Sequence, residues 1–319
     1  MHVRSVVLFT ALTITASAQT HTAHRTAPAD ETAIHNVFWQ PNNLHQGSPM
    51  FLTVELERPA RRVTGNFVNK TITFFSDSPG KKTWHALAGV DLDAQPGDYG
   101  LDVTATLVGG RVAHWSQKVT VAAGDFKTGD INVPENYVNP TDVEQKQIAQ
   151  DELLKKRAYA HSALHPLWSG DFIKPVNAAS TPTFGESRIL NEEKTSLHTG
   201  TDFPVAEATP VIVSNSGTVV LVRDLFYEGN TVIVDHGVGL FTVYLHMSRI
   251  DVHEGDKLDK GAKLGLSGAS GRVTGPHLHL GVRWSGVWLD PVQLLAITLP
   301  KTSFAASERH TAERLAHRR

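Results

Sequence analysis

The chain has 319 residues, of which 40% are hydrophobic and 19% charged, and its formal net charge at pH 7 is −2. This length allows two ordinary domains, each with its own core, and the near-neutral charge offers no global attraction to nucleic acid. The absence of cysteine excludes disulfides, thiolate metal sites and a cysteine nucleophile, so any metal would be held by His, Asp or Glu.

The first residues have the features of a secretory signal. Arg4 gives a positive start, residues 6–16 form a short apolar run, and residues 16–18 are a small-residue cleavage site. A transmembrane anchor is the alternative, but a bilayer span needs roughly 20 apolar residues. We predict a signal peptide over residues 1–18, export to the periplasm, cell envelope or medium, and no membrane span after its removal. Residues 19–31 are polar and aperiodic, which predicts a flexible leader.

Short alternating segments, separated by turn residues, recur between residues 32 and 123. Residues 51–56, 71–75 and 99–106 have this alternation, and Pro and Gly mark the turns at 78–80 and 95–98. The spacing is typical of an antiparallel β-sandwich, and we predict an immunoglobulin-like accessory domain.

A linker is predicted over residues 124–163, polar at first and then helical. Val143, Ile148, Leu153 and Leu154 fall near helical spacing among Gln, Glu and Lys. This pattern predicts a helix that packs one face on a neighbouring domain.

A second β domain is predicted over residues 164–298. Glycines and β-branched residues dominate again, as in residues 218–222 and 231–234. The mixed Arg and Glu residues of 299–319 predict a flexible tail. The expected fold class is therefore all-β, with a helical connector.

The spacing of a few histidines separates them from the 17 in the chain. His198 and Asp202 lie four apart in a segment that favours extended chain, which points both side chains to one face. His277, His279 and Arg283 alternate with apolar residues, so they share another face. Each pattern alone fits an ordinary solvent-exposed strand face. Together they offer two imidazoles and one carboxylate, the ligand set of catalytic zinc sites with an open fourth position.

Three motifs now carry a resemblance to a known family. HxGxD at 198–202, Tyr-Leu-His at 244–246 and Gly-Pro-His-Leu-His at 275–279 resemble, in this order, the M23 peptidases of the LytM and lysostaphin type. The likeness runs from Phe184, Gly185 and Arg188 to Asp290 and Pro291. It implies an antiparallel β-sheet peptidase domain of M23/LytM type, and the first 160 residues lie outside it.

The resemblance implies roles for five residues. His198, Asp202 and His279 would hold one Zn²⁺ per chain, while His246 and His277 would be catalytic, with the base left open between them. The implied function is hydrolysis of peptide bonds in peptidoglycan stem peptides or cross-links by a zinc-activated water. Two alternatives remain: a metal-free domain that binds the wall and activates another hydrolase, and a wall-binding or adhesion module.

Other candidate residues receive no site role. His236 and His253 occur in turns, where histidines are usually exposed or structural. A glycine-rich stretch that leads into the last motif predicts either a wall of a peptide groove or plain turns; it contains Gly265, Gly268, Gly271 and Gly275. No Lys-Ser/Thr follows these glycines, which argues against nucleotide binding.

Overall fold

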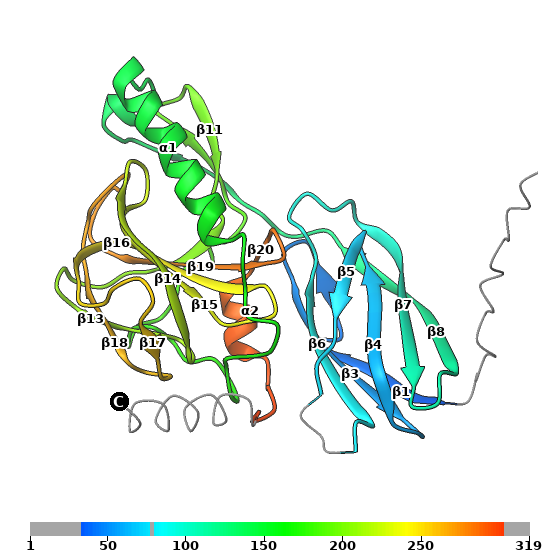
Figure 1. The fold of residues 1–319 in the computed structure, drawn as a ribbon. Helices are drawn as coiled ribbons and strands as arrows, with labels where there is room; N and C mark the ends of the chain where they lie inside the picture. Colours follow the sequence, from blue (N-terminus) through cyan, green and yellow to red (C-terminus); the bar gives the residue numbers. More distant parts are fainter. Residues whose placement is uncertain (1–32, 77–79, 303–319) are drawn as a thin grey trace, which may run out of the picture.

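The structure is a computed structural model that describes residues 33–76 and 80–302 (Figure 1). The predicted signal peptide, the leader and residues 303–319 of the predicted tail lie outside these residues. The predicted all-β fold is confirmed, with strands forming most of the regular structure. No helix in the described ranges is long and apolar enough to cross a membrane.

Residues 34–76 and 80–122 form two packed β-sheets that share a core. One sheet has the order β1 (Ile34–Gln40), β3 (Pro49–Leu56), β6 (Thr83–Gly89). The other has the order β2 (Leu44–His45), β8 (Val112–Ala122), β7 (Gly97–Leu107), β4 (Ala60–Phe67), β5 (Lys70–Thr73). The strands expected at 51–56, 71–75 and 99–106 correspond to β3, β5 and β7. Whether this sandwich is specifically immunoglobulin-like stays a prediction.

The connector contributes a strand and a helix to the neighbouring domain. Its elements are β9 (Thr128–Ile131), the 3-10 helix η1 (Glu135–Tyr137) and α1 (Asp142–Ala158). A capping box between Thr141 and Glu144 satisfies backbone groups at the start of α1.

The prediction of which residues form the buried face of this helix is partly wrong. Val143 and Leu153 are 76% and 55% exposed. The helix instead packs through Leu154, Ala158 and the following Tyr159 on a cluster of the large sheet. Its register follows these contacts and the buried Asp151, which accepts a hydrogen bond from the Phe226 backbone N–H at 2.8 Å. The few apolar residues of a mostly polar helix do not predict which side meets a neighbour.

The C-terminal part is built on a large antiparallel sheet. Its main path is β12 (Gly200–Phe203), β19 (Leu278–Trp284), β16 (Leu240–Ile250), β15 (Gly229–Asp235), β14 (Gly217–Leu225) and β17 (Lys257–Leu258). Attached to it are β13 (Pro210–Ile212), β18 (Lys263–Ser267) and β20 (Val287–Leu289). A small sheet beside it joins β9 to β10 (Ser187–Leu190) and β11 (Lys194–Leu197), and α2 (Pro291–Ala296) follows β20.

One hydrophobic cluster runs from the sandwich into the C-terminal part. The rings of Phe75 and Trp168 meet edge to face at 5.9 Å, and a side chain at Gly89 would collide with Leu289. Across the same boundary the Asp290 N–H donates to the Gly47 carbonyl at 2.8 Å. Leu299 and Thr302, at the start of the predicted tail, are also buried. The two parts therefore pack as one body.

Replacing Leu289 by Ala tests this shared core. The fully buried side chain fills the boundary, so its truncation should lower the free energy of unfolding by about 2–5 kcal/mol. Urea unfolding, followed by circular dichroism and tryptophan fluorescence, should show one common transition that shifts as a whole. Val108→Ala, at a 60% exposed position, is the control and should change little. Two separate transitions in the parent chain would contradict the shared core.

Candidate metal centre

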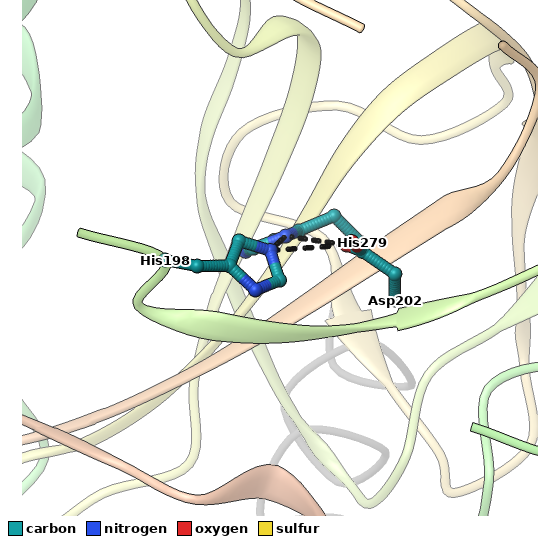
Figure 2. Close-up of side chains that lie close together, drawn as sticks. All are labelled: His198, Asp202 and His279. Carbon is teal, nitrogen blue, oxygen red and sulfur yellow. Dashed lines mark hydrogen bonds and ion pairs between the residues drawn. The ribbon is translucent and has the colours of Figure 1, made fainter. Parts of the chain in front are cut away.

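Three side chains predicted as ligands converge at one point (Figure 2). His198 Nε2 lies 2.9 Å from His279 Nδ1 and 3.1 Å from Asp202 Oδ1, and His279 Nδ1 lies 3.0 Å from Asp202 Oδ1. Asp202 on β12 pairs directly with His279 on β19, so the antiparallel register brings these two residues together. His198 reaches them from the preceding loop.

The local backbone differs from the extended chain expected over residues 197–203. Side chains four apart on a straight strand are separated by about 13 Å and cannot share an ion. The structure ends β11 at Leu197 and begins β12 at Gly200. This break at His198 and Thr199 turns the imidazole back toward Asp202, which is why the pair converges.

The donor atoms fit a zinc ion. A tetrahedral zinc with nitrogen and oxygen ligands at about 2.0–2.1 Å has ligand-to-ligand edges of roughly 3.3 Å. The triangle measured between the three donor atoms has edges of 2.9–3.1 Å. Two imidazoles and one carboxylate would leave the fourth position open to the groove, which these residues line.

Neighbouring groups orient the three donors. His198 Nδ1 donates to the Thr183 carbonyl at 2.7 Å, so Nε2 is the ring nitrogen directed to the centre. Arg188 Nη2 donates to Asp202 Oδ2 at 2.8 Å, and its Nε donates to Glu186. Such outer contacts commonly tune metal affinity. In the sequence, Arg188 is identified only as part of the family resemblance. Its pairing with Asp202 is a contact between separate strands, which local sequence patterns do not reveal.

Burial and mutual contacts set the protonation of the cluster. Burial alone raises the pKa of Asp202, but hydrogen bonds and charge from His198 and His279 outweigh it and hold this pKa well below its usual value. Burial lowers the pKa of His279 to about 4. At neutral pH the centre therefore offers an ionised carboxylate and an uncharged His279 imidazole, the forms that ligate metals.

Gly200 leaves room for His279. A Cβ at this position would lie 2.2 Å from His279 Nε2 and 2.5 Å from the Leu280 carbonyl oxygen. Any side chain here must displace the imidazole or the strand. Packing against His279 therefore explains why the middle residue of the HxGxD motif is glycine.

His246 and His277 stand beside the three donors. Their ring centroids are 4.9 Å apart, and the His246 ring is 6.0 Å from that of His279. His246 Nδ1 donates to the Ser270 carbonyl and His277 Nδ1 to the Gly275 carbonyl. In each ring Nε2 is therefore the nitrogen that no backbone carbonyl engages, and that of His277 lies 3.5 Å from Asp202 Oδ1. Both residues line the groove.

His246 does not end its strand, as the sequence suggested, because β16 continues to Ile250. Residues up to Leu245 pair with β19 and residues from Met247 pair with β18. His246 sits at this change of partner with φ +63°, a left-handed conformation that is rare for a non-glycine residue. Such backbone strain gathers at functional sites.

The residues left out of the site behave as structural or surface groups. His236 is fully buried, and its ring bonds to the Ser216 carbonyl and Thr242 hydroxyl. His253 has an exposed side chain. Of the four glycines singled out in the sequence, Gly275 lines the groove, while Gly271, at φ +75°, approaches the Gly229 backbone closely. Gly271 is therefore explained by turn geometry, whereas Gly275 forms part of the groove wall.

The groove around the centre has a volume of ≈ 1220 Å³. Its floor is the face of β16 and β19 that carries Phe241, Val243 and Leu245. The C-terminal half of α1 and the β10–β11 hairpin also line it.

The protonation of His246 gives a test in chelator-treated protein. Burial and the charges of His279 and His277 lower its pKa to about 3, against about 6.5 in an unfolded chain. Between these values the unfolded state binds more protons, so this residue destabilises the fold as the pH falls. We therefore compare the free energy of unfolding of His246→Gln with that of the parent. This difference should change by about 2 kcal/mol in favour of the variant when the pH is lowered from about 6.5 to 5. Urea titrations that give the same difference at both pH values would contradict a buried neutral imidazole.

Comparisons with known proteins agree with this geometry. Residues 196–291 match peptidase family M23. The peptidoglycan DD-endopeptidase ShyA of Vibrio cholerae is 44% identical over 106 residues, 33% of this chain and 24% of that protein. The DD-carboxypeptidase/endopeptidase Mpg of Neisseria meningitidis is 34% identical over 131 residues, 39% of this chain and 30% of that protein.

A crystallised Pseudomonas aeruginosa protein, described as a candidate M23 peptidase, matches with a TM-score of 0.58 and 26% identity. That match covers 80% of this chain and 95% of the other, so the likeness in fold extends beyond the C-terminal domain. The matches to the two curated relatives span less than a third of their length. Residues 196–291 of this chain therefore form a peptidase M23 domain.

Proposed function

We propose that this chain is a zinc-dependent metalloendopeptidase that hydrolyses peptide bonds in peptidoglycan outside the cytoplasm. The observation that carries the proposal is the triangle of His198, Asp202 and His279 donor atoms, with edges of 2.9–3.1 Å, in the wall of a groove. A relative named as a peptidoglycan DD-endopeptidase and one named as a DD-carboxypeptidase/endopeptidase support the substrate class. The predicted signal peptide supports the location.

The residues of the site divide the chemistry. His198, Asp202 and His279 would hold the zinc, and Arg188 would fix the orientation of the carboxylate. Zinc bound there supplies a Lewis acid for the scissile carbonyl and lowers the pKa of water. A backbone carbonyl engages Nδ1 of both His246 and His277, so Nε2 is the nitrogen of each ring left for proton transfer; that of His277 lies 3.5 Å from Asp202 Oδ1. Either can take a proton from the attacking water and return it to the leaving amine.

Metal content and peptide release test the proposal together. The purified chain should contain about one zinc per molecule and release peptides from peptidoglycan until a chelator is added. His279→Ala removes a donor and Gly200→Ala displaces the same ring, so both should lose bound zinc and activity. His253→Ala, at an exposed histidine outside the groove, is the matched control and should retain both.

The outcomes separate the competing functions. A chain without zinc that still sediments with peptidoglycan would favour a metal-free binding or activating domain. A zinc-loaded chain that cuts no wall preparation would exclude peptidoglycan hydrolysis as its activity. Unchanged peptide release by His279→Ala would refute the ligand assignment.

The roles of His246 and His277 can be separated from those of the ligands. His246→Gln and His277→Gln leave the three donors in place, so zinc content should stay near that of the parent. Loss of proton transfer should lower kcat by about 10²–10⁴-fold. The residue that acts as base should also change the acidic limb of the pH profile. Loss of zinc from either variant would indicate a ligand or a structural support instead.

A further inference from the structure

The groove extends along β19 from the predicted zinc ligands to Arg283. His279 and Arg283 lie on the same face of the strand and line the same groove. Gly281 lies between them and has no side chain. A Cβ at Gly281 would lie 3.1 Å from the Trp288 ring, which occupies this space instead. The floor between the metal centre and Arg283 is therefore free of a β19 side chain and bordered by an indole.

Aromatic rings hold the guanidinium of Arg283. Its Cζ lies 4.1 Å from the centroid of the Tyr159 ring and 5.8 Å from that of Trp288. Contacts of this kind cover the faces of a guanidinium, whereas its N–H donors point outward in its plane. Those donors suit a carboxylate, which can accept two parallel hydrogen bonds.

The charges that line the groove leave a cationic surplus. Lys155 pairs with Glu152 and Glu228, and Arg188 pairs with Glu186 and Asp202, so each carboxylate of the lining has a basic partner. Within the part of the chain that the structure describes, no carboxylate forms an ion pair with three further basic residues of the lining: Lys156, Arg272 and Arg283. Arg272 instead donates to the Ser196 hydroxyl and lies over the Tyr227 ring. A groove with this balance favours an acidic ligand.

A purely structural role would have Arg283 fasten α1 to the sheet. That attachment already has other contacts, because Lys155 on α1 binds Glu228 and Asp151 accepts the Phe226 N–H. Leu154 and Ala158 add apolar packing on the same cluster. Arg283 is thus not required to hold the helix, and its donors remain available to the groove.

We infer that Arg283 forms a carboxylate-binding subsite for the substrate peptide. The inference rests on the proposed peptidase function and adds a selectivity to it. Four residues along β19 span about 13 Å, which an extended peptide also covers in about four residues. The preferred substrate therefore carries a free carboxylate, on a side chain or at its C-terminus, about four residues from the bond that is cut.

The test compares peptidoglycan-derived peptides with free carboxylates and the same peptides converted to amides. Zinc-loaded parent protein should bind the free form about tenfold more tightly or better, as measured by titration calorimetry. Arg283→Gln should remove this preference and raise KM for the free form by a similar factor, with kcat and zinc content little changed. Arg283→Lys should restore part of the preference, because it keeps the charge without the planar pair of donors. Arg249→Gln, at an exposed arginine paired with Asp251, is the control and should retain the full preference.

The results distinguish this inference from the proposed function. A preference that persists in Arg283→Gln, as expected if the carboxylate binds the zinc itself, would overturn the subsite, as would a parent protein that binds both forms equally. Peptide cleavage without such a preference would sink the subsite and leave the peptidase proposal intact. A preference that depends on Arg283 in a protein that cuts no peptide would leave the subsite standing and refute the proposed activity.

Discussion

The main constraint on this structure is that three donor atoms lie within about 3 Å of one another. Two imidazole nitrogens and a carboxylate oxygen would repel one another at this distance unless a proton or a cation lies among them. The β12–β19 register sets Asp202 opposite His279, and the bare Cα of Gly200 leaves space for the ring. The surrounding fold therefore has to maintain an arrangement that is unfavourable without a shared positive charge.

Packing on both sides of the sheet holds the three donor atoms in this arrangement. The sheet that carries the site shares a hydrophobic cluster with the N-terminal sandwich, through residues such as Trp168 and Leu289. On the opposite side, α1 packs on β14 to β16 and forms one wall of the groove. Strain at His246 can persist because both flanking segments of β16 are paired with different strands. The metal centre and the N-terminal sandwich are thus connected by continuous packing.

The same packing gives the groove two chemically different regions. Near His279 the walls supply the predicted ligands and uncharged imidazoles, whereas around Arg283 they supply aromatic faces and a guanidinium that pairs with no carboxylate of the described residues. Carboxylates of the lining are already engaged by Lys155 and Arg188. A peptide in the groove would meet the proposed site for bond cleavage at one position and the proposed site for charge recognition at another.

The amino-acid sequence alone determined the all-β class, the main strands and the set of chemically informative residues, because alternation and short motifs are local properties. It placed His198, Asp202, His246, His277 and His279 in one family pattern. Local patterns did not reveal the break that folds His198 back, the change of strand partner at His246 or the side of α1 that is buried. Nor did they connect Arg188 to Asp202 or Arg283 to Tyr159. Those features depend on contacts between segments far apart in the chain, which only the tertiary packing decides.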